Sequence, residues 1–185
     1  TALPAGVLAN LGSLTRLSLR RNRLYSLNAS AFANLTLEEL RLDGNELREL
    51  PSGIFHGLVS LKSLHLHDNA LQTLDPSIFD TPKSALEELR LERNELRELP
   101  SGVFDELVSL KTLDLNNNTL LRLPARAFHE LIALEVLDLH ANGLLAVPSE
   151  AFASLASLKS LNLSSNDLLT FPKGTFGALT SLTAV

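Results

Sequence analysis

One pattern recurs seven times along this chain of 185 residues and limits its possible folds more than any other feature. Each copy reads L-x-x-L-x-L-x-x-N, and a phenylalanine follows 18 residues after the first leucine of the copy. The copies begin at Leu14, Leu37, Leu61, Leu86, Leu110, Leu134 and Leu158. Self-similarity at a period of about 20–50 residues indicates a stack of small structural units. We therefore expect a single repeat domain over residues 1–185.

The unit boundaries divide the chain into a partial repeat, seven full repeats and the start of another. These units are 1–13, 14–36, 37–60, 61–85, 86–109, 110–133, 134–157, 158–181 and 182–185. Most full units contain 24 residues, but the first is one residue shorter and the third is one longer, with Pro82 in place of the expected leucine.

The leucine spacing predicts a short strand in each unit, because alternate side chains of a strand point to opposite faces. One such strand cannot bury its apolar face alone, so neighbouring units stack into a parallel sheet and share a core. Most units continue with Leu-Pro, as at Leu50–Pro51, and proline cannot donate to a ladder. The return segment is therefore expected to be extended or a short turn. Its greater width curves the stack and places the strands on the concave face.

The repeated asparagine lies where the chain turns out of each strand. Its amide can satisfy backbone groups that the turn leaves without strand partners, so we expect a ladder of buried amides. This ladder consists of Asn22, Asn45, Asn69, Asn94, Asn118, Asn142 and Asn166. The repeated phenylalanine should form a second ladder on the opposite side. Its members are Phe32, Phe55, Phe79, Phe104, Phe128, Phe152 and Phe176.

The full pattern, LxxLxLxxNxLxxLPxxxFxxLxx, resembles the typical class of extracellular leucine-rich repeats. That class includes Toll-like receptor ectodomains, small leucine-rich proteoglycans and the variable lymphocyte receptors of jawless vertebrates, which the segment Asn94–Leu115 resembles most. The resemblance implies an α/β-type solenoid: a right-handed horseshoe with a parallel sheet on the concave face. It also implies irregular or 3-10 return segments on the convex face, and little α-helix. Cysteine-stapled caps, usual in secreted members, are absent, so we expect missing flanking sequence or ends that dock onto something.

Composition narrows the possible partners. The chain has no cysteine, which excludes disulfides, a thiol nucleophile and a cysteine zinc site. It has no apolar run of the about 20 residues that a membrane span needs, so we expect no direct membrane insertion in this segment. Its net charge of -5 argues against an anionic partner of the nucleic-acid kind, and we expect no nucleic acid to bind.

The outward strand positions form columns of polar residues across the repeats. They contain no aromatic residue, and Val136 is their only sizeable apolar side chain. Hot spots of protein interfaces favour Trp, Tyr and Arg, so Arg20, Arg41 and Arg90 are the candidate anchors for an acidic protein patch or a glycan. The alternative is that these positions are solvated and pair with one another across strands. The candidate ligand-binding residues are Arg16, Arg20, Arg41, Asp43, His65, His67, Arg90, Glu92, Asp114, Asn116, Asp138, His140 and Asn162.

No pattern of catalysis is present: the sequence has no phosphate loop, no nucleophile elbow and no His-Glu-x-x-His helix motif. His65 and His67 share a strand face with nearby carboxylates, a combination that could bind zinc. An open surface without a visible second shell disfavours such a site, so we expect no metal, no cofactor and no enzyme activity.

Asn28, Asn34, Asn117 and Asn162 begin N-x-S/T sequons and are candidate glycosylation sites, which favours an extracellular or cell-surface location. The function that these features favour is a recognition module with a polar or charged macromolecular ligand on its concave face. The alternative is a structural or assembly component that packs through uncapped ends, by self-association or against flanking domains, or through its convex face.

Overall fold

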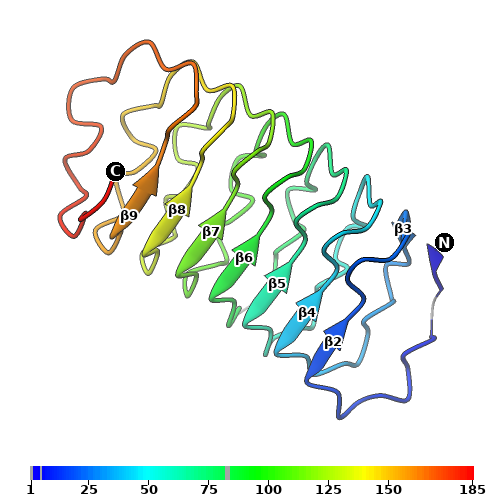
Figure 1. Cartoon of the computed structure of the whole chain (residues 1–185). Helices are drawn as coiled ribbons and strands as arrows, with labels where there is room; N and C mark the ends of the chain where they lie inside the picture. Colours follow the sequence, from blue (N-terminus) through cyan, green and yellow to red (C-terminus); the bar gives the residue numbers. More distant parts are fainter. Residues whose placement is uncertain (1, 5, 82–83) are drawn as a thin grey trace.

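A row of seven parallel strands, one per repeat, dominates the computed structural model (Figure 1). The structure describes residues 2–4, 6–81 and 84–185, so Pro82 and parts of the partial repeat 1–13 lie outside the described residues. The strands are β2 (Arg16–Ser18), β4 (Glu39–Arg41), β5 (Ser63–His65), β6 (Glu88–Arg90), β7 (Thr112–Asp114), β8 (Val136–Asp138) and β9 (Ser160–Asn162). A second, two-stranded sheet pairs β1 (Ala2–Leu3) with β3 (Ser26–Leu27). Within the described ranges the chain forms no helix, and so none that is long and apolar enough to cross a membrane.

The repeat sets the register of the sheet. The central leucine of each strand lies opposite the central leucine of the next, as Leu40 does opposite Leu64 and Leu64 opposite Leu89. These three side chains are fully buried, whereas the residues on either side of them point outward and are half-buried. Hydrogen bonds continue past the strand ends, for example from Leu42 N to His65 O at 2.9 Å. The predicted parallel-sheet solenoid is therefore confirmed.

The chain leaves each strand through a residue in the left-handed region of backbone space. The residue before the repeated asparagine has a positive φ in every full repeat, and only one of these residues is glycine, Gly44 at 67°. The others are Arg21, Asp68, Arg93, Asn117, Ala141 and Ser165, with φ between 49° and 55°. This conformation is unfavourable for residues with a side chain, so the surrounding contacts must hold it in place.

The asparagine that follows supplies those contacts. Asn94 Nδ2 donates to Leu91 O at 3.0 Å in its own coil and to Leu66 O at 3.1 Å in the preceding coil. Its Oδ1 accepts a hydrogen bond from Leu71 N at 3.0 Å, again in the preceding coil. Asn45, Asn69, Asn118, Asn142 and Asn166 repeat this arrangement. Each side chain thus joins two coils.

The first asparagine differs from the rest. Asn22 is exposed and donates only to carbonyls of its own coil, Leu19 O at 3.0 Å and Arg20 O at 3.2 Å. Asn45, Asn94 and Asn118 are buried, whereas Asn69, Asn142 and Asn166 are half-buried. The expectation that all these amides are buried is therefore wrong at Asn22, because burial of one coil requires a neighbour on each side.

The phenylalanines stack behind the sheet. Successive ring centroids lie 6.0 to 6.5 Å apart, and neighbouring ring planes differ by at most 20°. Short turns bring the rings into place, such as the bond from Leu58 N to Phe55 O at 3.0 Å. Every ring from Phe32 to Phe152 is buried, but Phe176, in the last of these coils, remains 38% exposed. The return segments are turns, as their prolines predict.

Candidate ligand-binding face

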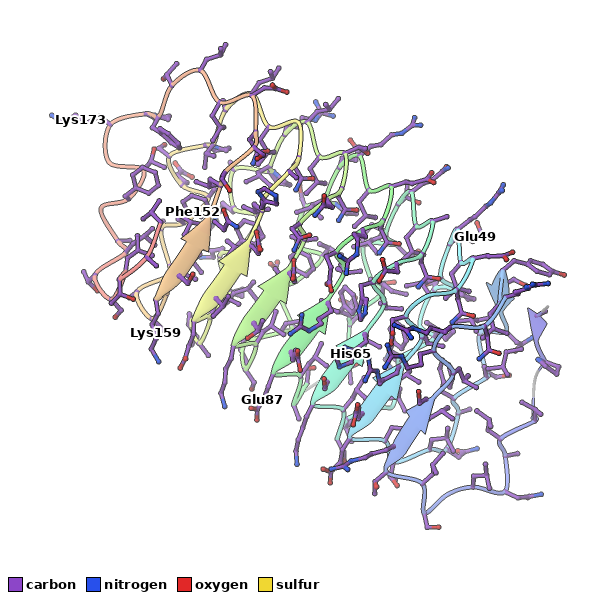
Figure 2. All side chains as sticks on the ribbon, viewed as in Figure 1. Glu49, His65, Glu87, Phe152, Lys159 and Lys173 are labelled. Atoms are coloured by element: carbon purple, nitrogen blue, oxygen red, sulfur yellow. The ribbon has the colours of Figure 1, made fainter. Side chains whose placement is uncertain are left out.

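The outward side chains of the seven strands and of the two residues after each strand form one continuous surface, here called the strand face. It includes all the candidate ligand-binding residues named from the sequence. Figure 2 shows His65 lying over the sheet near its middle. Val136 is 37% exposed and is the one large exposed apolar residue among the described positions of this surface.

Asp43 is the centre of the N-terminal half of the strand face. It is 2% exposed, and its carboxylate accepts Arg41 Nε at 3.1 Å and lies 3.2 Å from Arg20 Nε and 3.5 Å from His67 Nε2. Burial by itself would raise the pKa of this carboxyl, but the hydrogen bond from Arg41 and the charges of His67, Arg41 and Arg20 outweigh it and lower the pKa. Two of the expected anchors, Arg20 and Arg41, are therefore already engaged within the protein.

The third expected anchor is also paired. Arg90 Nε donates to Glu88 Oε1 at 2.6 Å, and this hydrogen bond together with nearby carboxylates raises the pKa of the guanidinium. Its second contacts are long, because Arg90 Nη1 lies 3.9 Å from both Glu92 Oε1 and Asp114 Oδ2. Contacts with carboxylates of the protein, within one coil at Arg41 and Arg90 and between coils at Arg20, thus occupy all three arginines. Arg16 is exposed and lies 3.7 Å from Glu39.

Glu92 is the least satisfied charged group of the strand face. It is 5% exposed, and its Oε2 is buried without a hydrogen-bond partner. Its Oε1 lies 3.6 Å from His67 Nδ1. Burial, reinforced by the negative charge of Asp114, raises the pKa of Glu92 to about 7.

The two histidines lie side by side with ring centroids 5.8 Å apart. His65 Nε2 hydrogen-bonds to Ser63 Oγ at 2.9 Å, and Nδ1 of both rings is buried without a partner. Burial lowers the pKa of both imidazoles, in His67 against the opposing charge of Asp43. Among the described residues, no group of three or more His, Cys, Asp or Glu side chains is arranged to hold a metal ion.

The C-terminal half of the strand face carries a pair of aspartates. Asp114 and Asp138 are direct partners in the register of β7 and β8. Asp114 Oδ1 accepts Asn116 N at 3.0 Å and Asn116 Nδ2 at 2.7 Å, and Asp138 Oδ1 accepts His140 N at 2.9 Å. Burial and the nearby charge of Asp138 raise the pKa of Asp114. The far end is neutral: Asn162 Oδ1 accepts from Ser164 Oγ at 2.6 Å.

Replacing Glu92 with glutamine tests the burial of this carboxyl. The unfolded group ionises near 4.5 and the folded group near 7, so the folded chain retains the proton between these values and loses stability as pH rises through them. Relative to the natural chain, the Glu92→Gln variant should gain about 2–3 kcal/mol in unfolding free energy between pH 4 and pH 8. Urea unfolding of both chains across this range measures the difference. Parallel pH profiles would contradict the prediction.

The sequons lie in different surroundings. Asn28 and Asn34 are exposed on the return side, and Asn28 Oδ1 accepts from Ser30 N and Oγ. Asn117 is exposed beside the strand face, but its Nδ2 donates to Asn116 Oδ1 at 2.6 Å. Asn162 lies in β9 and is half-buried.

A column of alternating charge along the edge where the strands begin was not recognised in the sequence. Lys62, Lys111 and Lys159 each contact a glutamate of the preceding coil, at 3.1, 2.7 and 2.7 Å respectively. Figure 2 shows Glu87 and Lys159 projecting from this edge. The signal was available, because Glu38, Lys62, Glu87, Lys111, Glu135 and Lys159 each follow the first leucine of a repeat. Exposed pairs of this kind contribute little individually, typically about 0–1 kcal/mol.

An apolar flank runs along the last three full coils. Leu121, Leu145 and Leu169 are 60%, 55% and 82% exposed, and each lies three residues after a repeated asparagine. Leu121, Leu145, Val147 and Pro148 line part of a groove of about 620 Å³. This flank lies beside the strand face rather than on it, so the pattern of outward strand positions does not predict it.

Comparison with known proteins agrees with the fold. The leucine rich repeat family matches residues 1–47, 35–84, 84–144 and 132–185, which together span the chain. Mouse trophoblast glycoprotein is 45% identical over 64 residues, 32% of this chain and 15% of the mouse protein. Toll, solved in the Toll–Spatzle complex of Drosophila, superimposes with a TM-score of 0.93 at 32% identity, over 97% of this chain and 24% of Toll.

A second structural neighbour corrects one expectation. The protein solved in the TLR13–ssRNA13 complex superimposes with a TM-score of 0.83 at 30% identity, over 94% of this chain and 25% of its own. The expectation that this chain binds no nucleic acid is therefore wrong as a conclusion from net charge, because a similar solenoid was solved in complex with single-stranded RNA. Net charge averages over the molecule, whereas binding depends on the potential at one face.

The chain spans about a quarter or less of each of these proteins. The relatives are receptor-type proteins, and their likeness extends over the repeats described above. This chain belongs to the leucine-rich-repeat family and resembles the extracellular, receptor-like members of the Toll group.

Proposed function

We propose that residues 1–185 form one recognition domain, without catalytic activity, that binds a polar or charged macromolecular ligand through the strand face and acts outside the cell or at its surface. The supporting observation is the paired charge network of that surface. Asp43, His67 and Arg90 are held by contacts within the protein, so their geometry exists before a ligand arrives. Binding then costs less side-chain entropy than it would on a mobile surface.

The structural neighbours support the same proposal. Toll was solved with Spatzle, a protein, and TLR13 with single-stranded RNA, so solenoids like this one are associated with macromolecular ligands. Asn28 and Asn34 lie on the return side and are the sequons whose glycans would leave the strand face open.

Selective blocking of one face tests the proposal, because the chain has no cysteine and a single one can be introduced. Val136→Cys on the strand face and Glu106→Cys on the return side are each coupled to polyethylene glycol. Binding is measured by biolayer interferometry against a basic protein, an acidic protein, a sulfated glycan, a neutral glycan and single-stranded RNA. Binding abolished by the block at Val136 and retained with the block at Glu106 supports the proposal. The reverse pattern contradicts it.

An assembly role is the second candidate, and the exposed leucines of the apolar flank favour it. Light scattering over a wide concentration range distinguishes the two candidates. A monomer throughout favours recognition. Oligomers that grow with concentration, and that Leu145→Gln or Leu169→Gln abolishes, favour assembly through this flank.

A further inference from the structure

Three arginines of the strand face have short contacts within the protein, whereas some of its carboxylate oxygens do not. The arginines that an acidic ligand would need are already paired: Arg20 and Arg41 with Asp43, and Arg90 with Glu88. A ligand carboxylate would have to displace these short contacts. The carboxylates of the neighbouring coils are less satisfied, and they lie together.

Asp114 and Asp138 present two negative charges side by side. They are direct partners across β7 and β8, where like charges repel each other. One oxygen of each is well bonded, but Asp138 Oδ2 has only a 3.4 Å contact with Asn116 Nδ2. Asp114 Oδ2 has Arg90 Nη1 at 3.9 Å, beyond hydrogen-bond length. The second oxygen of each aspartate, Oδ2, therefore has no short hydrogen bond.

Glu92 provides a second, independent observation at the same place. Only 5% of this residue is exposed, and its Oε2 has no hydrogen-bond partner. Its surroundings are His67 from the preceding coil, Arg90 and Arg93 from its own, and Asp114 from the next. A buried polar atom without a partner is uncommon in folded proteins, so this oxygen is free to accept a donor that a ligand supplies. Among these neighbours, Arg90 has its short contact with Glu88 and reaches Glu92 only at 3.9 Å.

We propose that Glu92, Asp114 and Asp138 form a cation-recognition subsite of the strand face, occupied by a lysine or arginine side chain of a basic protein partner. This inference rests on the proposed recognition function and specifies the chemistry of the ligand. A guanidinium group has several donors in a fork and can join oxygens on adjacent strands. A bare metal ion fits less well, because the described residues show no group arranged for one. Occupancy relieves the repulsion between the aspartates.

The test uses the full chain with capped hexa-arginine, hexa-glutamate and Ca²⁺ as probes, measured by isothermal titration calorimetry. The subsite variant is Asp114→Asn with Asp138→Asn. The matched control is Glu106→Gln with Glu150→Gln, which changes the net charge equally at exposed return-side positions. Asparagine keeps an acceptor oxygen for Asn116 N and His140 N, and urea unfolding verifies that both variants remain folded.

We expect hexa-arginine to bind the natural chain and the control equally, and to bind the subsite variant at least about tenfold more weakly. We also expect binding at pH 7 to release protons, since a cation favours the ionised form of Glu92, and Glu92→Gln to remove that release. Equal weakening in both variants would show an effect of net charge only and would overturn the inference. Absence of hexa-arginine binding, stronger binding of hexa-glutamate, or a response to Ca²⁺ alone would also overturn it.

These outcomes are distinct from failure of the proposed function. If a macromolecule of the panel binds and the block at Val136 removes its binding, the recognition function stands even where hexa-arginine fails. If blocking the strand face changes nothing for any ligand that binds, both proposals fail together.

Discussion

Replacing Asn94 with alanine should lower the free energy of unfolding by about 3–5 kcal/mol, because one buried side chain satisfies groups in two coils. Its amide donates to Leu66 O and Leu91 O and accepts from Leu71 N, at 3.0 to 3.1 Å. Alanine leaves these backbone groups buried without partners, and a buried donor or acceptor costs about 1–3 kcal/mol when unsatisfied. Urea unfolding followed by circular dichroism measures the loss.

Asn22→Ala is the matched control for this prediction. Asn22 is exposed and its amide bonds only to carbonyls of its own coil, so its removal should cost about 1 kcal/mol or less. A mid-chain defect in a repeat protein can also uncouple the coils on either side of it. We therefore expect Asn94→Ala, but not Asn22→Ala, to broaden the unfolding transition. Similar losses in the two variants would contradict the role assigned to the inter-coil bonds.

The second large effect is expected at Phe104. This ring is 1% exposed, and its centroid lies 6.0 Å from that of Phe79 and 6.2 Å from that of Phe128. Alanine in its place should lower the free energy of unfolding by about 3–5 kcal/mol, because apolar surface is no longer buried and a cavity remains between two rings. Chemical unfolding measures the change in midpoint and slope.

The Phe176→Ala variant separates the effect of burial on stability from the effect of the residue type. Phe176 is the same residue in the same register, but it is 38% exposed and has a stacked ring on one side only, at 6.4 Å from Phe152. Its replacement should cost about 1 kcal/mol, since solvent already reaches the site. If Phe176→Ala lowered the free energy of unfolding as much as Phe104→Ala, stacking between two buried rings would not be the source of the stability that Phe104 contributes.

Much of the fold could be predicted because it depends on local spacing. Inward leucines, the turn asparagine and the stacked phenylalanine each recur at fixed distances along the chain, so one unit describes the others. End effects could not be predicted from a single unit, and the exposure of Asn22 and Phe176 shows this. These residues match the pattern, but each lies in an outermost full coil.

The state of the strand face could be predicted only in part. Its residues were identified because outward positions alternate with leucine, but contacts such as Arg20–Asp43 and Asp43–His67 join neighbouring repeats and form only after the coils stack. Asp43 therefore proved to be shared by Arg20, Arg41 and His67, while Glu92 lies buried with a free oxygen. The partner class could not be derived from a net charge of -5, because that sum contains no positions.

The asparagine hydrogen bonds between coils all run in the same direction along the chain. Each joins its own coil to the one before it, as Asn118 bonds to Leu91 O and Leu96 N, whereas Asn22 has only local bonds. A ribosome delivers the coils in this same order. Each new coil therefore already contains the asparagine that hydrogen-bonds to the preceding coil. The nascent solenoid can thus fold one coil at a time, before the later coils are synthesised.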